Sequence, residues 1–266
     1  MTKKPIIAAI CLVGLVAPSL PIPAQDLKKD QEHNLYLRVI RASTWIVLPK
    51  PAAPGKISFG EGSGWVVSRK RKLVVTNYHV VGESKDVQVF FPYYQNNILL
   101  KARKPYVKLI ATGKGLPGKV IAKDKERDLA VIQLSIVPTW AATLPVAAEG
   151  VSPGDRVYSL GCPGGEESLW QFSGSTVLKV EKIRVKSKGE DDKIMTVHAK
   201  MIETDDVRTR KGLSGGMLVN QRGELVGVVQ SISHKEPQTT MSVERAEVLE
   251  FLEANKIKAQ IGGKKK

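Results

Sequence analysis

The feature that most constrains the fold of this chain is a long succession of short apolar runs separated by turn residues. Each run is rich in β-branched or aromatic side chains and is bounded by glycine, proline or charged residues, a pattern typical of β-strands. The runs lie at 44–48, 64–68, 72–76, 87–91, 118–122, 129–134, 156–160, 176–185, 195–201, 217–219 and 224–231. Because no helical pattern alternates with them, the sequence predicts an all-β sandwich or barrel and not βαβ units.

Helical patterns occur only near the two ends of the chain. The first is a lead-in segment, 25–40, whose mixed polar composition is compatible with a helix. The second runs over 243–254, where Ser242 stands at the N-cap position and apolar residues recur at helical spacing. A basic tail, 256–266, follows it.

The first 24 residues have the pattern of a secretory signal. Lys3 and Lys4 precede an apolar run over 5–18, and a short segment ends in Ala24 before polar residues begin. The run is too short to cross a bilayer comfortably, which favours removal of the signal, residues 1–24, over a retained anchor. No later stretch is long and apolar enough for a transmembrane helix. The sequence therefore predicts a periplasmic or secreted protein.

Composition narrows the kinds of partner and site. The chain has 41 Lys+Arg against 26 Asp+Glu, a balance that suits anionic partners, but it shows no nucleic-acid-binding motif. Two cysteines, Cys11 in the signal and Cys162 beyond it, exclude a disulfide framework and a multi-cysteine zinc site. The sequence leaves the oligomeric state open.

The strongest local signal for chemistry is the segment 212–216, Gly-Leu-Ser-Gly-Gly. Glycines on both sides of Ser214 allow a tight turn that exposes the hydroxyl and leaves backbone N–H groups available for a developing oxyanion. The segment also fits the nucleophile elbow of α/β-hydrolases, but that interpretation needs a catalytic histidine well downstream and a βαβ context. Only His234 follows Ser214, and the surrounding pattern is not βαβ.

A serine nucleophile needs a base, and the chain has four histidines. His79 stands at the end of an apolar strand, before a short turn. The other three lie in the polar lead-in, in an alternating strand and beside a lysine in a loop, and they are His33, His198 and His234. His79 is therefore the candidate base.

The third member of such a site is a carboxylate that orients the imidazole. Asp128 begins the apolar run 129–134, so it can turn inward while the charged residues 125–127 stay in solvent. His79, Asp128 and Ser214 then follow the chain order of the chymotrypsin-type double barrel, which differs from the order in subtilisins and α/β-hydrolases. This order selects the three residues as a candidate triad.

Three strings of the sequence resemble those of a known family. They are TNYHVV at 76–81, DLAVIQL at 128–134 and GLSGGMLVNQRGELVGV at 212–228. They resemble the trypsin-like serine proteases, and among them most closely the bacterial HtrA/Deg-like peptidases. Further similar segments lie at 62–67, 158–164 and 203–205, so that the likeness covers roughly 40–255.

The resemblance implies an all-β fold, a chymotrypsin-like double β-barrel with a C-terminal helix. The peptidase domain would span 41–255, with the first barrel at about 41–140 and the second at about 150–240. It implies a serine endopeptidase in which His79 takes the proton of Ser214 and Asp128 orients His79. The N–H groups of Gly212 and Ser214 would form the oxyanion hole, and no metal or organic cofactor would be required.

The resemblance also implies how a protein or peptide substrate binds. Residues Gln230, Ser231 and Ile232 match the strand that pairs with an extended substrate backbone. Arg208 matches the floor of the pocket for the residue on the acyl side of the cleaved bond. A cation there would repel Lys or Arg, so we expect Val, Ala, Leu or similar residues at that position.

Departures from the family pattern leave two other functions open. Leu213 stands where Asn or Asp is usual, 207–211 is unusually basic, and no PDZ domain follows the helix. One alternative is a catalytically silent relative that binds peptides. The other is a polyanion-binding module that uses residues 101–127, which carry nine Lys/Arg against two acids and which we expect to form an elaborated loop.

Overall fold

The computed structural model describes residues 27–51, 58–165, 168–188, 194–207, 211–233 and 238–263. The predicted signal, 1–24, and Arg208 lie outside these ranges. Within them, no helix has the length and apolar character needed to cross a membrane.

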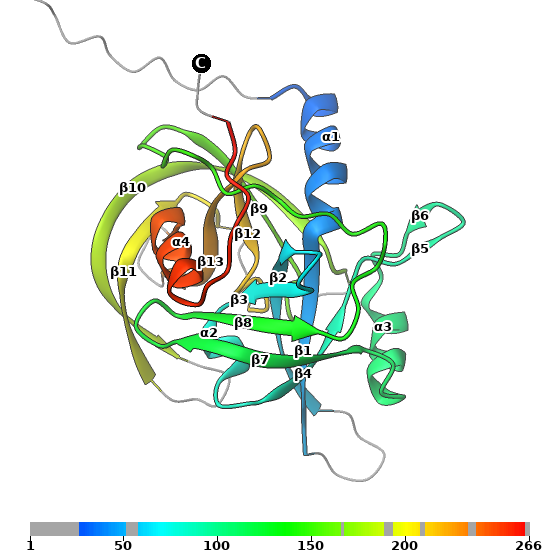
Figure 1. Ribbon diagram of the computed structural model, residues 1–266. Coiled ribbons are helices and arrows are strands. Elements are labelled where there is room, and N and C mark those ends of the chain that lie inside the picture. The colour runs from blue at the N-terminus through cyan, green and yellow to red at the C-terminus, as the bar shows by residue number, and fades with distance from the viewer. Residues whose placement is uncertain are drawn as a thin grey trace, which may run out of the picture.

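The strands form two closed six-stranded antiparallel barrels that lie side by side (Figure 1). The first barrel contains β1 (Ser43–Lys50), β2 (Ser58–Ser68), β3 (Leu73–Thr76), β8 (Leu129–Leu134), β7 (Leu116–Asp124) and β4 (Asp86–Phe90), in that order. The second contains β10 (Gln171–Lys188), β11 (Ile194–Thr204), β14 (Thr239–Glu244), β13 (Leu225–Ser233), β12 (Met217–Asn220) and β9 (Arg156–Gly161). The predicted double barrel is therefore confirmed.

Short helices accompany the two barrels. The lead-in forms α1 (Lys29–Val39) and a short 3₁₀ turn, η1 (Ile40–Ala42), and α2 (Tyr78–Val81) follows β3. The C-terminal helix, α4 (Arg245–Ala254), begins two residues later than the sequence predicts. The reason is that Ser242 and Val243 extend β14, pairing with β11. The helix is capped instead by Glu244, whose carboxylate accepts a hydrogen bond from the Ala246 N–H at 2.7 Å.

The basic segment 101–127 is not an elaborated loop, and that prediction was wrong. After the small hairpin β5 (Tyr94–Gln95) and β6 (Ile98–Leu99), it forms α3 (Arg103–Ala111) and then β7. Tyr106 and Ile110, four residues apart, lie on one face of α3 and are both buried. The Arg103 guanidinium lies 4.8 Å from the centre of the Trp45 ring. The run is thus an amphipathic helix followed by a barrel strand.

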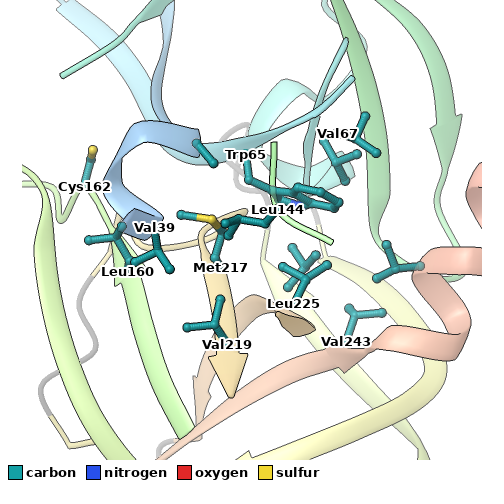
Figure 2. Close-up of a cluster of buried hydrophobic side chains, with 14 of the residues drawn as sticks. Val39, Trp65, Val67, Leu144, Leu160, Cys162, Met217, Val219, Leu225 and Val243 are labelled. Carbon is teal, nitrogen blue, oxygen red and sulfur yellow. The ribbon is translucent and has the colours of Figure 1, made fainter. Parts of the chain in front are cut away.

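The largest buried cluster draws its side chains from both barrels and from α1. Figure 2 shows Trp65 of β2 beside Leu144, which lies between β8 and β9, and Met217 of β12. Val39 of α1 lies near Leu160 of β9 in the same view. Because these side chains are close-packed across the boundary, they set how the barrels sit against each other. Residues from the two barrels can therefore meet at one site.

We expect Trp65→Ala to lower the free energy of unfolding by about 3–5 kcal/mol, because it removes a fully buried side chain from this cluster. Trp65→Phe is the matched control. It keeps an aromatic ring and removes an indole N–H that is buried without a hydrogen-bond partner among the described residues. Denaturant unfolding of both variants measures the free energy of unfolding. Equal losses in the two variants would contradict the packing role given to the Trp65 ring.

Candidate active site

Pairing of β3 with β8 brings the candidate base and carboxylate together. Thr76, the last residue of β3, pairs with Ala130 in β8, so the residues just after β3 and just before β8 lie at the same end of the barrel. The His79 Nδ1 atom lies 2.7 Å from Asp128 Oδ2. The main-chain N–H of His79 donates to Asp128 Oδ1 at 2.8 Å. The ring and its backbone are thus held by the two oxygens of one carboxylate.

Asp128 itself is held in an uncommon backbone conformation. Its φ is +56°, in the left-handed region that few residues other than glycine, asparagine and aspartate adopt. Its side chain is fully buried, and its carbonyl accepts a hydrogen bond from Asn77 Nδ2 at 2.8 Å. The conformation is therefore set by surrounding contacts, as is common where a side chain must be aimed accurately.

Gln230 of β13 links this pair to the serine of the second barrel. Its side-chain Nε2 donates to Asp128 Oδ2 at 3.0 Å. Its main-chain carbonyl accepts a hydrogen bond from Ser214 Oγ at 3.0 Å. The Ser214 hydroxyl is thus directed at the main chain of β13. The hydrogen bond between a nucleophile and its base often forms fully only when substrate is present.

The turn that carries Ser214 packs closely against β2 of the first barrel. Ser63 donates its N–H to the Ser214 carbonyl at 2.7 Å and its Oγ–H to the Gly212 carbonyl at 2.7 Å, and its Oγ accepts a hydrogen bond from the Cys162 N–H at 2.8 Å. Gly215 has a φ of +83°, and a Cβ there would lie 2.1 Å from the Ser63 carbonyl oxygen. Only glycine fits this approach, so the glycines around Ser214 serve barrel packing as well as the turn.

The same turn presents donors for an anion. The backbone N–H groups of Gly212 and Ser214 have no hydrogen-bond acceptor within the part of the chain that the structure describes. Gly212 has a φ of +90°, a conformation that orients successive peptide groups differently from a strand or helix. Two N–H groups of this kind next to a hydroxyl can stabilise negative charge on an oxygen bound beside it.

We expect Ser63→Ala to lower the free energy of unfolding by about 1–3 kcal/mol, because it leaves the Gly212 carbonyl and the Cys162 N–H without their partner in a buried place. Ser242→Ala is the matched control. The Ser242 hydroxyl is equally buried but has no hydrogen-bond partner among the described residues, so its removal should cost little. Thermal unfolding of both variants checks this, and similar losses would contradict the role given to Ser63.

The strand predicted to pair with substrate is β13. Its register with β12 ends at Val228, whereas its register with β14 continues to Ser233. Ser231 and Ile232 therefore have a neighbouring strand on one side only, among the described residues. The expected pocket floor, Arg208, is outside the described ranges.

The other histidines do not join this cluster. His33 is exposed on α1, His198 of β11 contacts Glu126 at 3.3 Å, and His234 is outside the described residues. Among the described residues, no group of His, Cys, Asp and Glu side chains is arranged to hold a metal ion. Burial raises the pKa of the Cys162 thiol, which disfavours the reactive thiolate.

Sequence reasoning missed two residues that organise the site and misplaced a third. It assigned Gln230 to substrate binding and did not predict its hydrogen bond to Asp128. The signal that could have pointed to this role is a polar residue directly after the apolar run 225–229. It noted Ser63 only as part of a similar segment. It also expected Arg127 in solvent, but this guanidinium binds three carboxylates.

A family model and curated proteins similar to this chain point to one family. The family model described as "Trypsin-like peptidase domain" matches residues 62–228. The chain is 27% identical over 177 residues to the serine protease Do-like HtrA of Lactobacillus helveticus, covering 65% of this chain and 36% of that protein. It is 28% identical over 171 residues to the periplasmic serine endoprotease DegP of Salmonella typhimurium, covering 64% and 30%. The chain thus spans about a third of the length of these relatives.

Solved structures agree on the fold. The active form of the Rv3671c protease from M. tuberculosis has a TM-score of 0.60 at 22% identity, covering 95% of this chain and 97% of that one. The HtrA-type protease AlgW with a decapeptide has a TM-score of 0.60 at 18% identity, covering 84% and 66%. The resemblance noted in the sequence is confirmed, and the matched segment contains His79, Asp128 and Ser214. With more than half of its length matched, the chain belongs to the trypsin-like peptidase domain family.

Proposed function

We propose that the chain is a serine-type endopeptidase that hydrolyses peptide bonds in proteins through an acyl-enzyme intermediate. One observation carries the proposal, namely the buried His79–Asp128 pair at 2.7 Å linked through Gln230 to Ser214 of the other barrel. The names of the curated relatives, a serine protease and a serine endoprotease, support the same activity.

The mechanism follows from what each group can donate or accept. Ser214 Oγ attacks the carbonyl carbon of the scissile bond while His79 Nε2 takes its proton. Asp128 accepts the Nδ1–H of His79 and stabilises the imidazolium that forms. The N–H groups of Gly212 and Ser214 bind the oxyanion. The imidazolium then gives its proton to the leaving amine, and a water molecule activated by His79 hydrolyses the ester to free Ser214.

Substrate binding uses the side of β13 beyond the end of β12. An extended peptide would add to Gln230, Ser231 and Ile232 as a further strand. The family resemblance assigns Arg208 to the floor of the pocket, and on that assignment the residue on the acyl side of the cleaved bond would be Val, Ala, Leu or similar. Cleavage sites mapped in a peptide library test this preference, and enrichment of Lys or Arg before the cut would contradict it.

Export of the protein is part of the proposal. The signal pattern over 1–24 supports it, and so does the description of the DegP relative as periplasmic. Amino-terminal sequencing of the protein recovered from the periplasm or medium would show a chain that begins near Gln25. A chain that keeps its first residues in the cell membrane would indicate an anchor instead.

The decisive experiment treats the chain without residues 1–24 with a fluorophosphonate probe and with casein. An endopeptidase is labelled at Ser214 and digests casein, and Ser214→Ala does neither. A catalytically silent peptide-binding relative would bind casein peptides without labelling or cleavage. The hydrogen bond from the Ser214 hydroxyl to the Gln230 main-chain carbonyl is the observation that keeps this second candidate in the test.

The structure weakens the case for a polyanion-binding module. Within 101–127, Arg103 pairs with Glu61 at 2.5 Å, and Arg127 pairs with three carboxylates. Lys125 lies 2.7 Å from Glu83, with Lys123 at 3.6 Å from the same residue. Four of the nine cations in this run thus have an acidic partner. Heparin affinity that falls steeply with salt would revive the alternative.

We expect peptide hydrolysis to rise with pH, with a midpoint between about pH 6 and 7.5, because a histidine base must be neutral to accept a proton. The dependence of kcat/KM on pH measures this. Chelators should leave the rate unchanged, since no proposed step uses a metal. Inhibition by a chelator that zinc or calcium reverses would contradict the mechanism.

A further inference from the structure

We infer that Arg127 is a positioning residue for the active site, which holds the turn carrying Asp128 against the C-terminal helix α4. This inference rests on the proposed role of Asp128 in orienting His79. Arg127 directly precedes Asp128, in the turn between β7 and β8. Among the described residues its side chain binds Asp124, Glu247 and Glu250, so it would act on His79 through Asp128.

The Arg127 guanidinium binds three carboxylates at once. Its Nε lies 2.8 Å from Glu247 Oε2, its Nη2 lies 2.8 Å from Glu250 Oε2 and its Nη1 lies 3.0 Å from Asp124 Oδ2. Burial lowers the pKa of the guanidinium, but the hydrogen bonds to these three groups outweigh burial and raise it. A planar fork with five N–H donors can meet three acids in this way, whereas a lysine ammonium is a single point of charge.

These contacts cross from one barrel to the other. Asp124 and Arg127 belong to the first barrel, and Glu247 and Glu250 lie on α4, which follows the second. Glu247 is itself fixed, because its other oxygen, Oε1, accepts the Lys200 N–H of β11 at 2.9 Å. The turn is also bound to β11 directly, since the His198 N–H donates to the Glu126 carbonyl at 2.8 Å. Helix, strand and turn thus form one connected unit.

The position of the Asp128 carboxylate depends on this turn. The Arg127 N–H donates to Asp124 Oδ1 at 2.9 Å, so Asp124 closes the turn and also binds the guanidinium. The next residue, Asp128, has its left-handed φ of +56°. A shift of the turn would therefore move the carboxylate relative to the His79 ring. Misplacement of a catalytic group by about 1 Å can cost on the order of a hundredfold in rate.

The test compares Arg127→Gln and Arg127→Lys with Lys125→Gln. Lys125 is a neighbouring cation whose described contacts are with the exposed Glu83 and the ring of Tyr78. Rates are expressed per active site titrated with the fluorophosphonate probe. We expect Arg127→Gln to lower kcat by on the order of tenfold to a hundredfold with KM within about twofold. Arg127→Lys should restore little of this loss. Lys125→Gln should match the wild type.

Two readouts separate positioning from general stability. The acidic limb of the pH profile should move to lower pH in Arg127→Gln, in the same direction as in Asp128→Asn, because the imidazolium loses the carboxylate that stabilises it. The low-field NMR proton of the His79 Nδ1–H···Asp128 hydrogen bond should shift or broaden in Arg127→Gln and stay in place in Lys125→Gln. This second readout needs no hydrolysis.

Glu250→Gln guards against a variant that fails to fold, because the Glu250 side chain is 63% exposed. Glu250→Gln should show the same changes as Arg127→Gln to a smaller degree. The double variant of Glu250→Gln and Arg127→Gln should lose less kcat than the two single losses combined. Variants with a lower Tm but an unchanged kcat per titrated site, pH profile and NMR proton would overturn the inference. An unlabelled, inactive wild type would instead overturn the proposed function, and the NMR comparison would still decide the role of Arg127.

Discussion

Ser214→Ala is expected to lower kcat for peptide hydrolysis by on the order of 10⁵–10⁶-fold, which is the loss seen when the nucleophile of a triad is removed. The physical reason is that a methyl group has no lone pair with which to attack the carbonyl carbon. Folding should be spared, because among the described residues the hydrogen bond of Ser214 Oγ is one to the Gln230 main-chain carbonyl. Initial rates on a fluorogenic peptide, with stopped-assay times of days for the variant, measure the loss.

His79→Ala should produce a loss of similar size, and the double variant should be no worse than either single one. Residues that act as a unit lose their effect together, so their separate losses do not add. The suitable control is His33→Ala, which removes an exposed imidazole on α1. Retained hydrolysis in Ser214→Ala, or losses that add in the double variant, would contradict a triad.

Asp128→Asn is expected to lower kcat by about 10⁴-fold, because the amide no longer holds the tautomer of His79 that has its proton on Nδ1. In this chain Asp128 Oδ2 accepts hydrogen bonds from both His79 Nδ1 and Gln230 Nε2. An asparagine can offer one acceptor oxygen and one NH₂ group. The NH₂ group of the asparagine must therefore face either the donors at Oδ2, which are His79 Nδ1 and Gln230 Nε2, or the main-chain N–H of His79 at Oδ1. In either place a donor stands where an acceptor is needed.

Asp86→Asn is the matched control for this substitution, since Asp86 is exposed at the start of β4 and should tolerate the amide within the error of the assay. The kcat of both variants and their thermal unfolding should be measured together. A large loss of stability in Asp128→Asn without a change in kcat per titrated site would show that the carboxylate is structural. Equal kcat in the two variants would remove Asp128 from the mechanism.

The local features of the fold were predictable because they depend on short-range patterns. Alternating or continuous apolar runs bounded by turn residues identified every barrel strand except β14 (Thr239–Glu244), whose last residues were assigned to the C-terminal helix and its cap. The helix of residues 103–111 was missed because a run of cations masks its two buried residues, Tyr106 and Ile110. Its amphipathic face is recognisable only against the ring of Trp45, more than fifty residues earlier in the chain.

The candidate triad was predictable for a different reason. Residue chemistry and chain order select His79, Asp128 and Ser214, and both are properties of the sequence. The distances between these residues are not, because they arise from strand pairing and from the packing of two barrels around side chains such as Trp65 and Met217. Gln230 shows the limit well, since its side chain meets Asp128 of the other barrel, 102 positions away.

The sequence by itself determined the strand pattern, the family and the three residues expected to carry chemistry, because each is written in local composition, spacing or order. Only the tertiary structure decided that Ser63 binds the serine turn, that Gln230 connects the two halves of the site and that Arg127 binds α4. The physical reason is that these contacts join residues distant in the chain through hydrogen bonds and ion pairs. Such contacts depend on where the closed barrels place each side chain, and no periodicity along the chain records that placement.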